Sequence, residues 1–273
     1  MKYKYIGKSY IRPDAINKVT GKAIYLDDIR LPDMLYAAVL RPQYAHARIL
    51  KIDASEVEKC PGVVKVVTGK DCKFRYGDNI KDLQPMAVDK VRYIGDPVAA
   101  VIADSPAHAR AALAKFKVDY EPLPVYTDAL DAMKPGTALI HEDMENYWRL
   151  PTLKETPGTN VANTYHLVKG RGEEGFDEAD VIVEGEFNYP LGSCAAIETH
   201  GTIVQFHVDK TIEVWSTSIC PFIIREDLAN SYGIPVADVR VHTPDLGGCF
   251  GYKSDITTEQ TIAWIASFMP GRP

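Results

Sequence analysis

RYIGDPVAAVIADSPAHARAALAKFKVDYEPLP, residues 92–124, is the segment whose secondary structure the sequence specifies most strongly. Residues 96–103 form a short apolar run, typical of a strand that is buried on both faces. Ser105 can cap a helix with its side-chain oxygen, and Pro106 suits the first helical position, where a missing N–H is harmless. Residues 107–117 are rich in strong helix formers. We therefore expect a strand that leads into a helix.

The chain becomes extended again at residues 118–121 before Pro122 and Pro124 end the segment. The whole segment therefore has the order strand, helix, strand. Two more strands and a short helix are expected upstream, at residues 36–40, 63–67 and 54–58, respectively. This mixture of strands and helices predicts an α+β domain over residues 1–125.

Residues 126–175 are looser, with several Pro-Gly turns and a polar stretch, and we interpret them as a connector that crosses a surface. A second domain is expected over residues 176–273. It begins with an alternating strand at residues 179–187. The further elements expected there are a hairpin at 202–208 and 211–217, a helix opened by Pro221 and closed by Gly233, a strand at 239–242 and a helix at 256–269.

Composition restricts the class of protein. The 273 residues are 46% hydrophobic and 25% charged, and 31 basic against 37 acidic side chains give a net charge of −6. Such a surface does not attract nucleic acid. There is no apolar run of the ~20 residues that span a bilayer, and the first fourteen residues lack the apolar core of a secretory signal. We therefore expect a cytoplasmic protein with no membrane partner.

The five cysteines are scattered, and none forms a CxxC pair. This spacing argues against a disulfide framework, a zinc ribbon and a cysteine-ligated iron–sulfur cluster. Reduced thiols fit best.

The glycine-rich segment Gly247-Gly248-Cys249-Phe250-Gly251 carries the strongest chemical signal, because it lies between a predicted strand and a predicted helix. Glycines permit a tight turn with exposed N–H groups, and a helix N-terminus adds partial positive charge. Together they make a cradle for phosphate or a similar anion, to which Lys253 could add a full charge. The nucleotide P-loop and the dinucleotide fingerprint both require other spacings. From these residues alone, a tight strand–helix corner that binds no ligand is about as well supported as an anion-binding cradle.

Other candidate residues are better explained by structure. We interpret His200 as a structural hydrogen-bonding residue, and Cys249 as a packed thiol rather than an activated one. Asp27-Asp28 and Glu173-Glu174 are expected on solvated faces. The seven histidines show no metal-ligand spacing.

Taken in order, these segments resemble the molybdenum-binding large subunit of the xanthine dehydrogenase/aldehyde oxidase family. The matching motifs are Arg12-Pro13-Asp14 with residues 18–23 and 31–36, Ala45-His46-Ala47-Arg48-Ile49, the segment 93–124, Glu198-Thr199-His200-Gly201, and residues 247–253. The resemblance identifies residues 1–125 with the α/β-hammerhead domain of the family. It identifies residues 176–273 with the N-terminal, incomplete part of the molybdopterin-binding domain.

The resemblance implies a molybdenum–molybdopterin cofactor, in bacteria often the cytosine dinucleotide form. It assigns contacts with this cofactor to Gly248, Cys249, Phe250 and Gly251, and neither a catalytic residue nor a metal ligand to this chain. The implied reaction is hydroxylation of a small molecule, namely an aromatic heterocycle, a purine or an aldehyde, with water as the oxygen source. Electrons would leave through an iron–sulfur subunit and an FAD subunit.

The sequence departs from the family pattern at several positions. Gly192 stands where the family often has a glutamine, and Ser254 stands where a glutamate is frequent. Cys249 and Tyr252 replace common glycines. Family large subunits also continue for several hundred residues. We therefore expect a truncated, split or degenerate subunit that is inactive alone. It would share the cofactor with another chain or with a missing C-terminal part.

Two alternatives remain open at this stage. The first is a non-catalytic scaffold or assembly subunit that keeps the fold without the cofactor, as the departures at Gly192 and Ser254 suggest. The second, weaker alternative is a phosphate- or nucleotide-binding domain built on the glycine turn.

Overall fold

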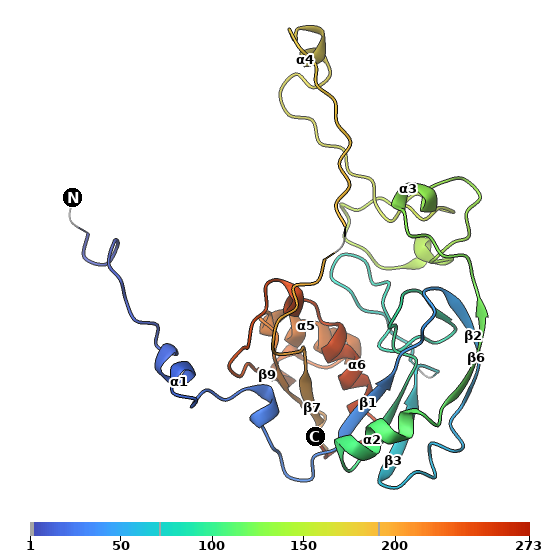
Figure 1. Cartoon of the computed structure of the whole chain (residues 1–273), viewed down its shortest axis with the longest axis vertical. Coiled ribbons are helices and arrows are strands. Elements are labelled where there is room, and N and C mark those ends of the chain that lie inside the picture. Colours follow the sequence, from blue (N-terminus) through green and yellow to red (C-terminus); the bar gives the residue numbers. More distant parts are fainter. Residues whose placement is uncertain (1–2, 71, 191) are drawn as a thin grey trace.

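The computed structural model describes residues 3–70, 72–190 and 192–273. It shows a folded body of three three-stranded sheets, from which two segments project (Figure 1). One projection is the N-terminal segment that carries α1 (Ala15–Val19), and the other is an arm with α4 (Glu174–Asp177) at its tip. Within these described ranges, no helix is both long and apolar enough to cross a bilayer.

The first sheet has the order β1-β5-β3 and is antiparallel throughout. Its strands are β1 (Tyr36–Leu40), β5 (Ala99–Ala103) and β3 (Val63–Thr68). All five residues of β5 are buried, as the sequence predicts, because a helix covers each face of the sheet. Val101 and Ala103 pack with α2 (Pro106–Leu113), and Ala100 and Ile102 pack with α6 (Thr257–Ala266).

The predicted cap of α2 is confirmed. The Ser105 hydroxyl accepts a hydrogen bond from the His108 N–H at 3.3 Å, and Pro106 occupies the first turn. The helix ends earlier than predicted, at Leu113, and Lys117 already belongs to β6 (Lys117–Pro122). The strands on either side of α2 lie in different sheets, so α2 bridges two sheets rather than two neighbouring strands.

The second sheet has the order β4-β2-β6, and both of its strand pairs are antiparallel. Its strands are β4 (Lys90–Val91), β2 (Ala47–Asp53) and β6. Neither β2 nor β4 was predicted from the sequence.

The third sheet has the order β7-β8-β9 and contains the predicted hairpin. Its strands are β7 (Thr202–Phe206), β8 (Ile212–Ser216) and β9 (Val239–His242). Helix α5 (Pro221–Tyr232) connects β8 to the parallel strand β9, and it ends at Gly233, whose φ of +64° is left-handed. Ile224 and Leu228 are buried on one face of this helix.

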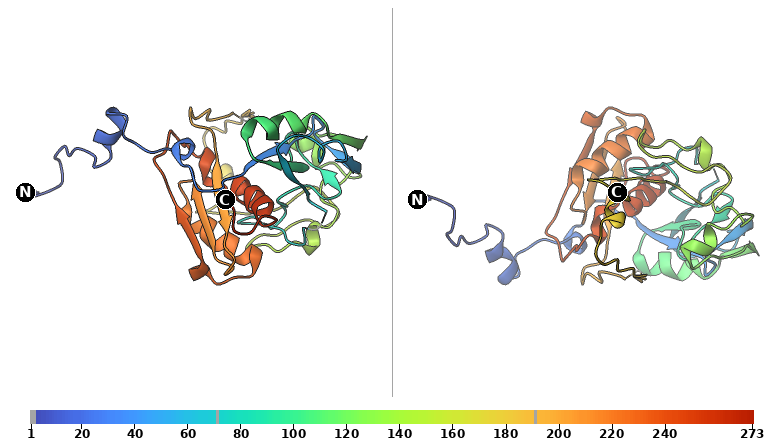
Figure 2. Two further views of the ribbon diagram at one scale, coloured as in Figure 1. Left: turned by 90° about the horizontal axis from the view of Figure 1, so that it is seen from below. Right: turned by 90° about the horizontal axis from the view of Figure 1, so that it is seen from above.

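Helix α6 joins the two halves of the body, because it lies between the first and third sheets (Figure 2). Ala263 belongs to the core of the third sheet, whereas Trp264 and Ile265 belong to the core of the first. The Trp264 indole N–H also donates to the Thr68 carbonyl at 3.1 Å. The halves are therefore packed through one shared helix.

Two predicted elements are wrong. Residues 179–187 contain no strand, and every residue from 162 to 190 is exposed. Residues 54–58 form hydrogen-bonded turns rather than a helix, with the Val57 N–H donating to the Ala54 carbonyl at 2.9 Å. The short helix α3 (Ala129–Ala132), which Asp128 caps through two backbone N–H groups, was not predicted.

Asp96 makes stability depend on pH. Burial raises the pKa of this carboxyl to about 6, although its Oδ2 accepts the Arg92 N–H at 3.1 Å. A pKa above the unfolded value of about 4 means that the stabilising contribution is full below about pH 4 and is lost as the pH rises through 6.

Asp96→Asn keeps an acceptor but cannot ionise. We expect it to raise the free energy of unfolding at pH 7.5 by on the order of 2 kcal/mol and to leave it unchanged near pH 4. Urea unfolding at the two pH values measures this effect, with the exposed neighbour Asp89→Asn as the control. A variant that is less stable than the wild type at pH 7.5 would contradict the assignment.

Candidate functional site

The glycine turn, residues 247–251, follows β9 and leads into a 3₁₀ turn, Tyr252–Ser254. Its backbone is left-handed at three positions, with φ of +106° at Gly248, +56° at Phe250 and +94° at Gly251. Positive φ is uncommon for an aromatic residue and stores strain. The Phe250 ring is nonetheless 75% exposed, so burial of the ring within this chain does not compensate for that strain.

Gly247, the first glycine of the turn, is required because its backbone lies too close to Glu198 to leave room for a side chain. A Cβ on Gly247 would lie 2.5 Å from the Cβ of Glu198, which is closer than two carbons can pack. A Cβ on Gly251 would meet no atom within 4 Å, so this glycine is required by its φ alone. The turn thus packs tightly against Glu198 on one side and is open on the other.

A buried ion pair holds the turn in place. Lys253 is fully buried, and its Nζ lies 2.6 Å from Glu198 Oε2. The same carboxylate oxygen accepts the Gly247 N–H at 2.8 Å. Removing Glu198 would leave the fully buried charge of Lys253 without a partner. Lys253 is therefore a structural cation, and the prediction that it adds charge to a ligand is wrong.

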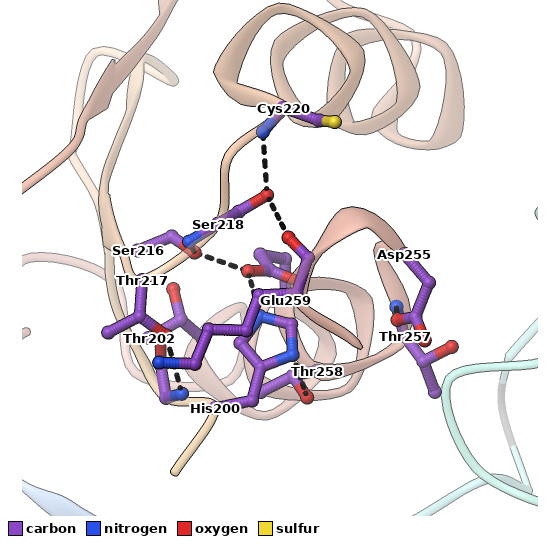
Figure 3. A network of polar contacts seen from close by, with 12 residues as sticks. His200, Thr202, Ser216, Thr217, Ser218, Cys220, Asp255, Thr257, Thr258 and Glu259 are labelled. Atoms are coloured by element: carbon purple, nitrogen blue, oxygen red, sulfur yellow. Dashed lines mark hydrogen bonds and ion pairs between the residues drawn. The ribbon is translucent and has the colours of Figure 1, made fainter. Parts of the chain in front are cut away.

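A second polar network joins His200, Ser216 and Glu259 (Figure 3). The His200 imidazole lies 2.9 Å from Glu259 of α6, and the Ser216 hydroxyl donates to the same carboxylate. The Ser218 hydroxyl donates to the Lys253 carbonyl at 3.0 Å, which joins β8 to the turn. His200 is thus a structural hydrogen-bonding residue, as predicted, and its side chain is buried.

The outer side of the turn carries free donors. Among the residues that the structure describes, no group accepts a hydrogen bond from the N–H of Gly248, Cys249, Phe250 or Gly251. The turn is anchored through its carbonyls and through Gly247 instead: the thiol of Cys194 contacts the Phe250 carbonyl at 3.0 Å, and the Ser254 hydroxyl donates to the Gly251 carbonyl. Unpaired backbone N–H groups in a turn are suited to an anionic or oxygen-rich group.

The predicted contribution of a helix dipole is wrong. Helix α6 begins at Thr257, beyond the 3₁₀ turn, and the Asp255 carboxylate already accepts the Thr257 N–H at 2.9 Å. The backbone of the turn itself therefore provides the donors.

A pocket of about 490 Å³ adjoins the inner side of the turn. Gly247 and Glu198 line it together with Tyr25, Thr199 and Thr217. Glu198 Oε1 is buried and has no hydrogen-bond partner within the described part of the chain. This oxygen can accept a hydrogen bond from a donor bound in the pocket.

The remaining candidates lie elsewhere or serve the fold. Gly192 and Cys194 are exposed, and Asp27-Asp28 and Glu173-Glu174 are solvated as predicted. No cluster of potential metal ligands occurs in the described ranges. The sequence reasoning missed the pairing of Glu198 with Lys253 and of His200 with Glu259. A signal in the sequence was Glu259, a charged residue in the otherwise uncharged helix α6.

The structure is that of an α+β protein whose second part carries a glycine turn with unpaired backbone donors. Two family models match the chain. One, described as "Aldehyde oxidase and xanthine dehydrogenase, a/b hammerhead domain", covers residues 20–124. The other, described as "Molybdopterin cofactor-binding domain", covers residues 153–273.

Similar proteins agree with these matches. A probable xanthine dehydrogenase subunit of Bacillus subtilis is 32% identical, with 97% of this chain and 34% of the relative covered. The carbon monoxide dehydrogenase large chain of Hydrogenophaga pseudoflava is also 32% identical, with 96% and 34% covered. The crystal structure of quinoline 2-oxidoreductase from Pseudomonas putida 86 superposes with a TM-score of 0.83 at 28% identity, with 99% and 34% covered.

The chain belongs to the xanthine dehydrogenase/aldehyde oxidase family, as its sequence resemblance predicts. It spans about a third of the length of the curated relatives it matches.

The buried ion pair gives a direct prediction. Lys253→Met should lower the free energy of unfolding by about 3 kcal/mol, because Glu198 is left without a cation. Adding Glu198→Gln should restore part of the loss, and a double-mutant cycle by urea unfolding measures the coupling. Lys134→Met, which breaks an exposed pair with Asp131, is the matched control and should cost less than about 1 kcal/mol. Equal, additive losses at Lys253 and Glu198 would contradict the role given to the pair.

Proposed function

We propose that this chain provides part of the molybdopterin site of a molybdenum hydroxylase that works as a multisubunit complex. The observation that carries the proposal is the row of unpaired N–H groups on Gly248, Cys249, Phe250 and Gly251. These residues lie within the region matched by the molybdopterin cofactor-binding model. The donors suit an oxygen-rich pterin phosphate or metal ligand.

In this proposal the residues of the chain bind and orient, and none transfers a proton. The four N–H groups donate to the cofactor, and the exposed Phe250 ring packs against it and excludes water. Glu198 and Lys253 keep the turn rigid, so that the donors need no rearrangement on binding. When bound, the molybdenum–pterin group supplies a two-electron redox centre.

The wider features of the proposal follow from the family. The substrate is a small aromatic heterocycle, purine or aldehyde that is hydroxylated with oxygen from water. The cofactor is the cytosine dinucleotide form, and electrons pass to iron–sulfur and FAD subunits in the cytoplasm. The hammerhead domain occupies residues 1–125, the connector 126–175 and the cofactor region 176–273. Residues 1–273 alone are inactive, because they span about a third of the relatives' length and provide only part of the site.

Cofactor loading tests the proposal. The complex purified with its co-expressed subunits should contain molybdenum and pterin, measured by elemental analysis and by pterin fluorescence. Gly251→Ala should lower both contents about tenfold, because an L-residue disfavours φ of +94° and would shift the donors. Gly136→Ala, at φ +79° in the connector, is the matched control. A stable wild-type complex that lacks both metal and pterin would refute the proposal.

A scaffold subunit that keeps the fold without the cofactor is the second candidate. It is favoured by Gly192, which has no side chain, and by Ser254, whose hydroxyl is engaged by the Gly251 carbonyl. A double variant, Gly192→Gln with Ser254→Glu, made in the assembled complex distinguishes a cofactor-bearing subunit from a scaffold. A cofactor-bearing subunit should show at least a severalfold change in turnover of an aldehyde or heterocycle panel, measured by dye reduction, whereas a scaffold should show no activity before or after the change.

A further inference from the structure

A pocket of about 330 Å³ lies between the start of α5 and strand β9, two elements that pack together in the core of the third sheet (Figure 1). Its lining contains two basic side chains, Arg225 of α5 and Arg240 of β9, and no acidic side chain among the described residues. The rest of the lining is apolar apart from Thr243, and it includes Phe222, whose ring is 74% exposed. The pocket therefore combines two positive charges with an apolar surface.

Both guanidinium groups of this pocket lack an acidic partner. In the ranges that the structure describes, neither Arg225 nor Arg240 forms an ion pair. Glu213 is the neighbour of Arg240 across the pairing of β8 and β9, but His242 engages its carboxylate at 2.6 Å. Asp238 and Arg240 line a neighbouring pocket without pairing. Two cations in one pocket repel each other, and an anion bound between them would relieve that repulsion.

Arg225 is held in an orientation that suits anion binding. Its Nε donates to the Val236 carbonyl at 2.9 Å, and its two Nη groups have no acceptor in the described part of the chain. The planar fork of an arginine matches two oxygens of a phosphate or a carboxylate. Because the two arginines together carry two positive charges, a dianion matches them best, and a phosphate monoester carries close to two negative charges at neutral pH.

We propose that this pocket binds a small phosphate ester whose organic part is apolar or aromatic. Arg225 and Arg240 hold the phosphate oxygens, and the Thr243 hydroxyl is a further donor to them. The pocket leaves room beyond an oxyanion, and the exposed ring of Phe222 packs against the organic part of the ligand. The site requires neither molybdenum nor pterin, so it stands or falls independently of the proposed function.

The surroundings of the pocket favour a small ligand over a polyanion. The net charge of −6 weakens the attraction of a nucleic acid or an anionic lipid surface. Acidic residues also flank the two arginines, since Glu226 follows Arg225 along α5 and Asp238 lies two residues before Arg240. A chain of phosphates would meet these carboxylates, whereas a single phosphate inside the pocket contacts the arginines alone.

Isothermal titration calorimetry at low ionic strength tests the class of ligand. Phenyl phosphate should bind with a Kd of about 1 mM or lower, because it offers two charges and a ring. Phenyl sulfate has the same ring but one charge, and inorganic phosphate has no ring, so each should bind about fivefold more weakly or worse. Equal affinities for phenyl phosphate and inorganic phosphate would overturn the proposal in favour of free phosphate. The absence of phenyl phosphate binding at about 10 mM would overturn it outright.

Substitution of the arginines tests the location of the site. Arg240→Met should weaken phenyl phosphate binding about tenfold, and Arg225→Lys, which keeps the charge but loses the fork, about threefold. Arg240 is exposed, so its substitution should leave thermal unfolding unchanged. Arg110→Met, at an exposed position of α2 outside the pocket, is the matched control and should leave the affinity unchanged. Equal weakening by Arg110→Met and Arg240→Met would indicate attraction by net charge alone and would overturn the proposal.

A further variant tests the organic part of the ligand. Phe222→Ala should reduce the affinity for phenyl phosphate to that for inorganic phosphate, because the ring contact is lost while both arginines remain. The affinity for inorganic phosphate should be the same in the variant and the wild type. Undiminished binding of phenyl phosphate by Phe222→Ala would overturn the assignment of an aromatic or apolar ester.

Discussion

The ion pair between Glu198 and Lys253 is the constraint on which the site depends. It joins residues 55 positions apart, and the same carboxylate oxygen also holds the Gly247 N–H. Since these contacts hold the inner side of the turn, its outer N–H groups remain free to face a ligand. The pair therefore fixes the start of a glycine-rich segment, at the cost of burying the charge of Lys253.

Helix α6 connects the region around this ion pair to the rest of the molecule. Its first turn carries Glu259, which hydrogen-bonds His200 and Ser216 beneath the site, and its later residues pack into the core of the hammerhead sheet. The Thr261 hydroxyl donates to the Pro85 carbonyl at 3.0 Å, which adds a polar contact across the two halves. The cofactor region is thus supported by the hammerhead domain, and neither half is a separate unit of packing.

Local signals predicted the local elements well. The cap at Ser105, the helix closed by Gly233 and the hairpin of β7 and β8 depend on residues close in sequence, and all three form. Pairings over long distances could not be predicted in this way: the assignment of the strands around α2 to two sheets depends on β2, and the role of Lys253 depends on Glu198. The glycine turn forms where it was predicted. The predicted contributions of a helix dipole and of an unpaired Lys253 cation were wrong. The strand predicted at residues 179–187 does not form in the structure. A strand needs a hydrogen-bonded neighbouring strand as well as an alternating sequence, and the sequence shows only the second.

An experimental structure of the assembled complex tests the central claim most directly. We predict a pterin group within hydrogen-bonding distance of the N–H groups of Gly248, Cys249, Phe250 and Gly251, with the Phe250 ring against it and the pair of Glu198 and Lys253 intact. The contradicting result is a turn whose N–H groups are bonded to protein side chains, with any cofactor bound elsewhere in the complex.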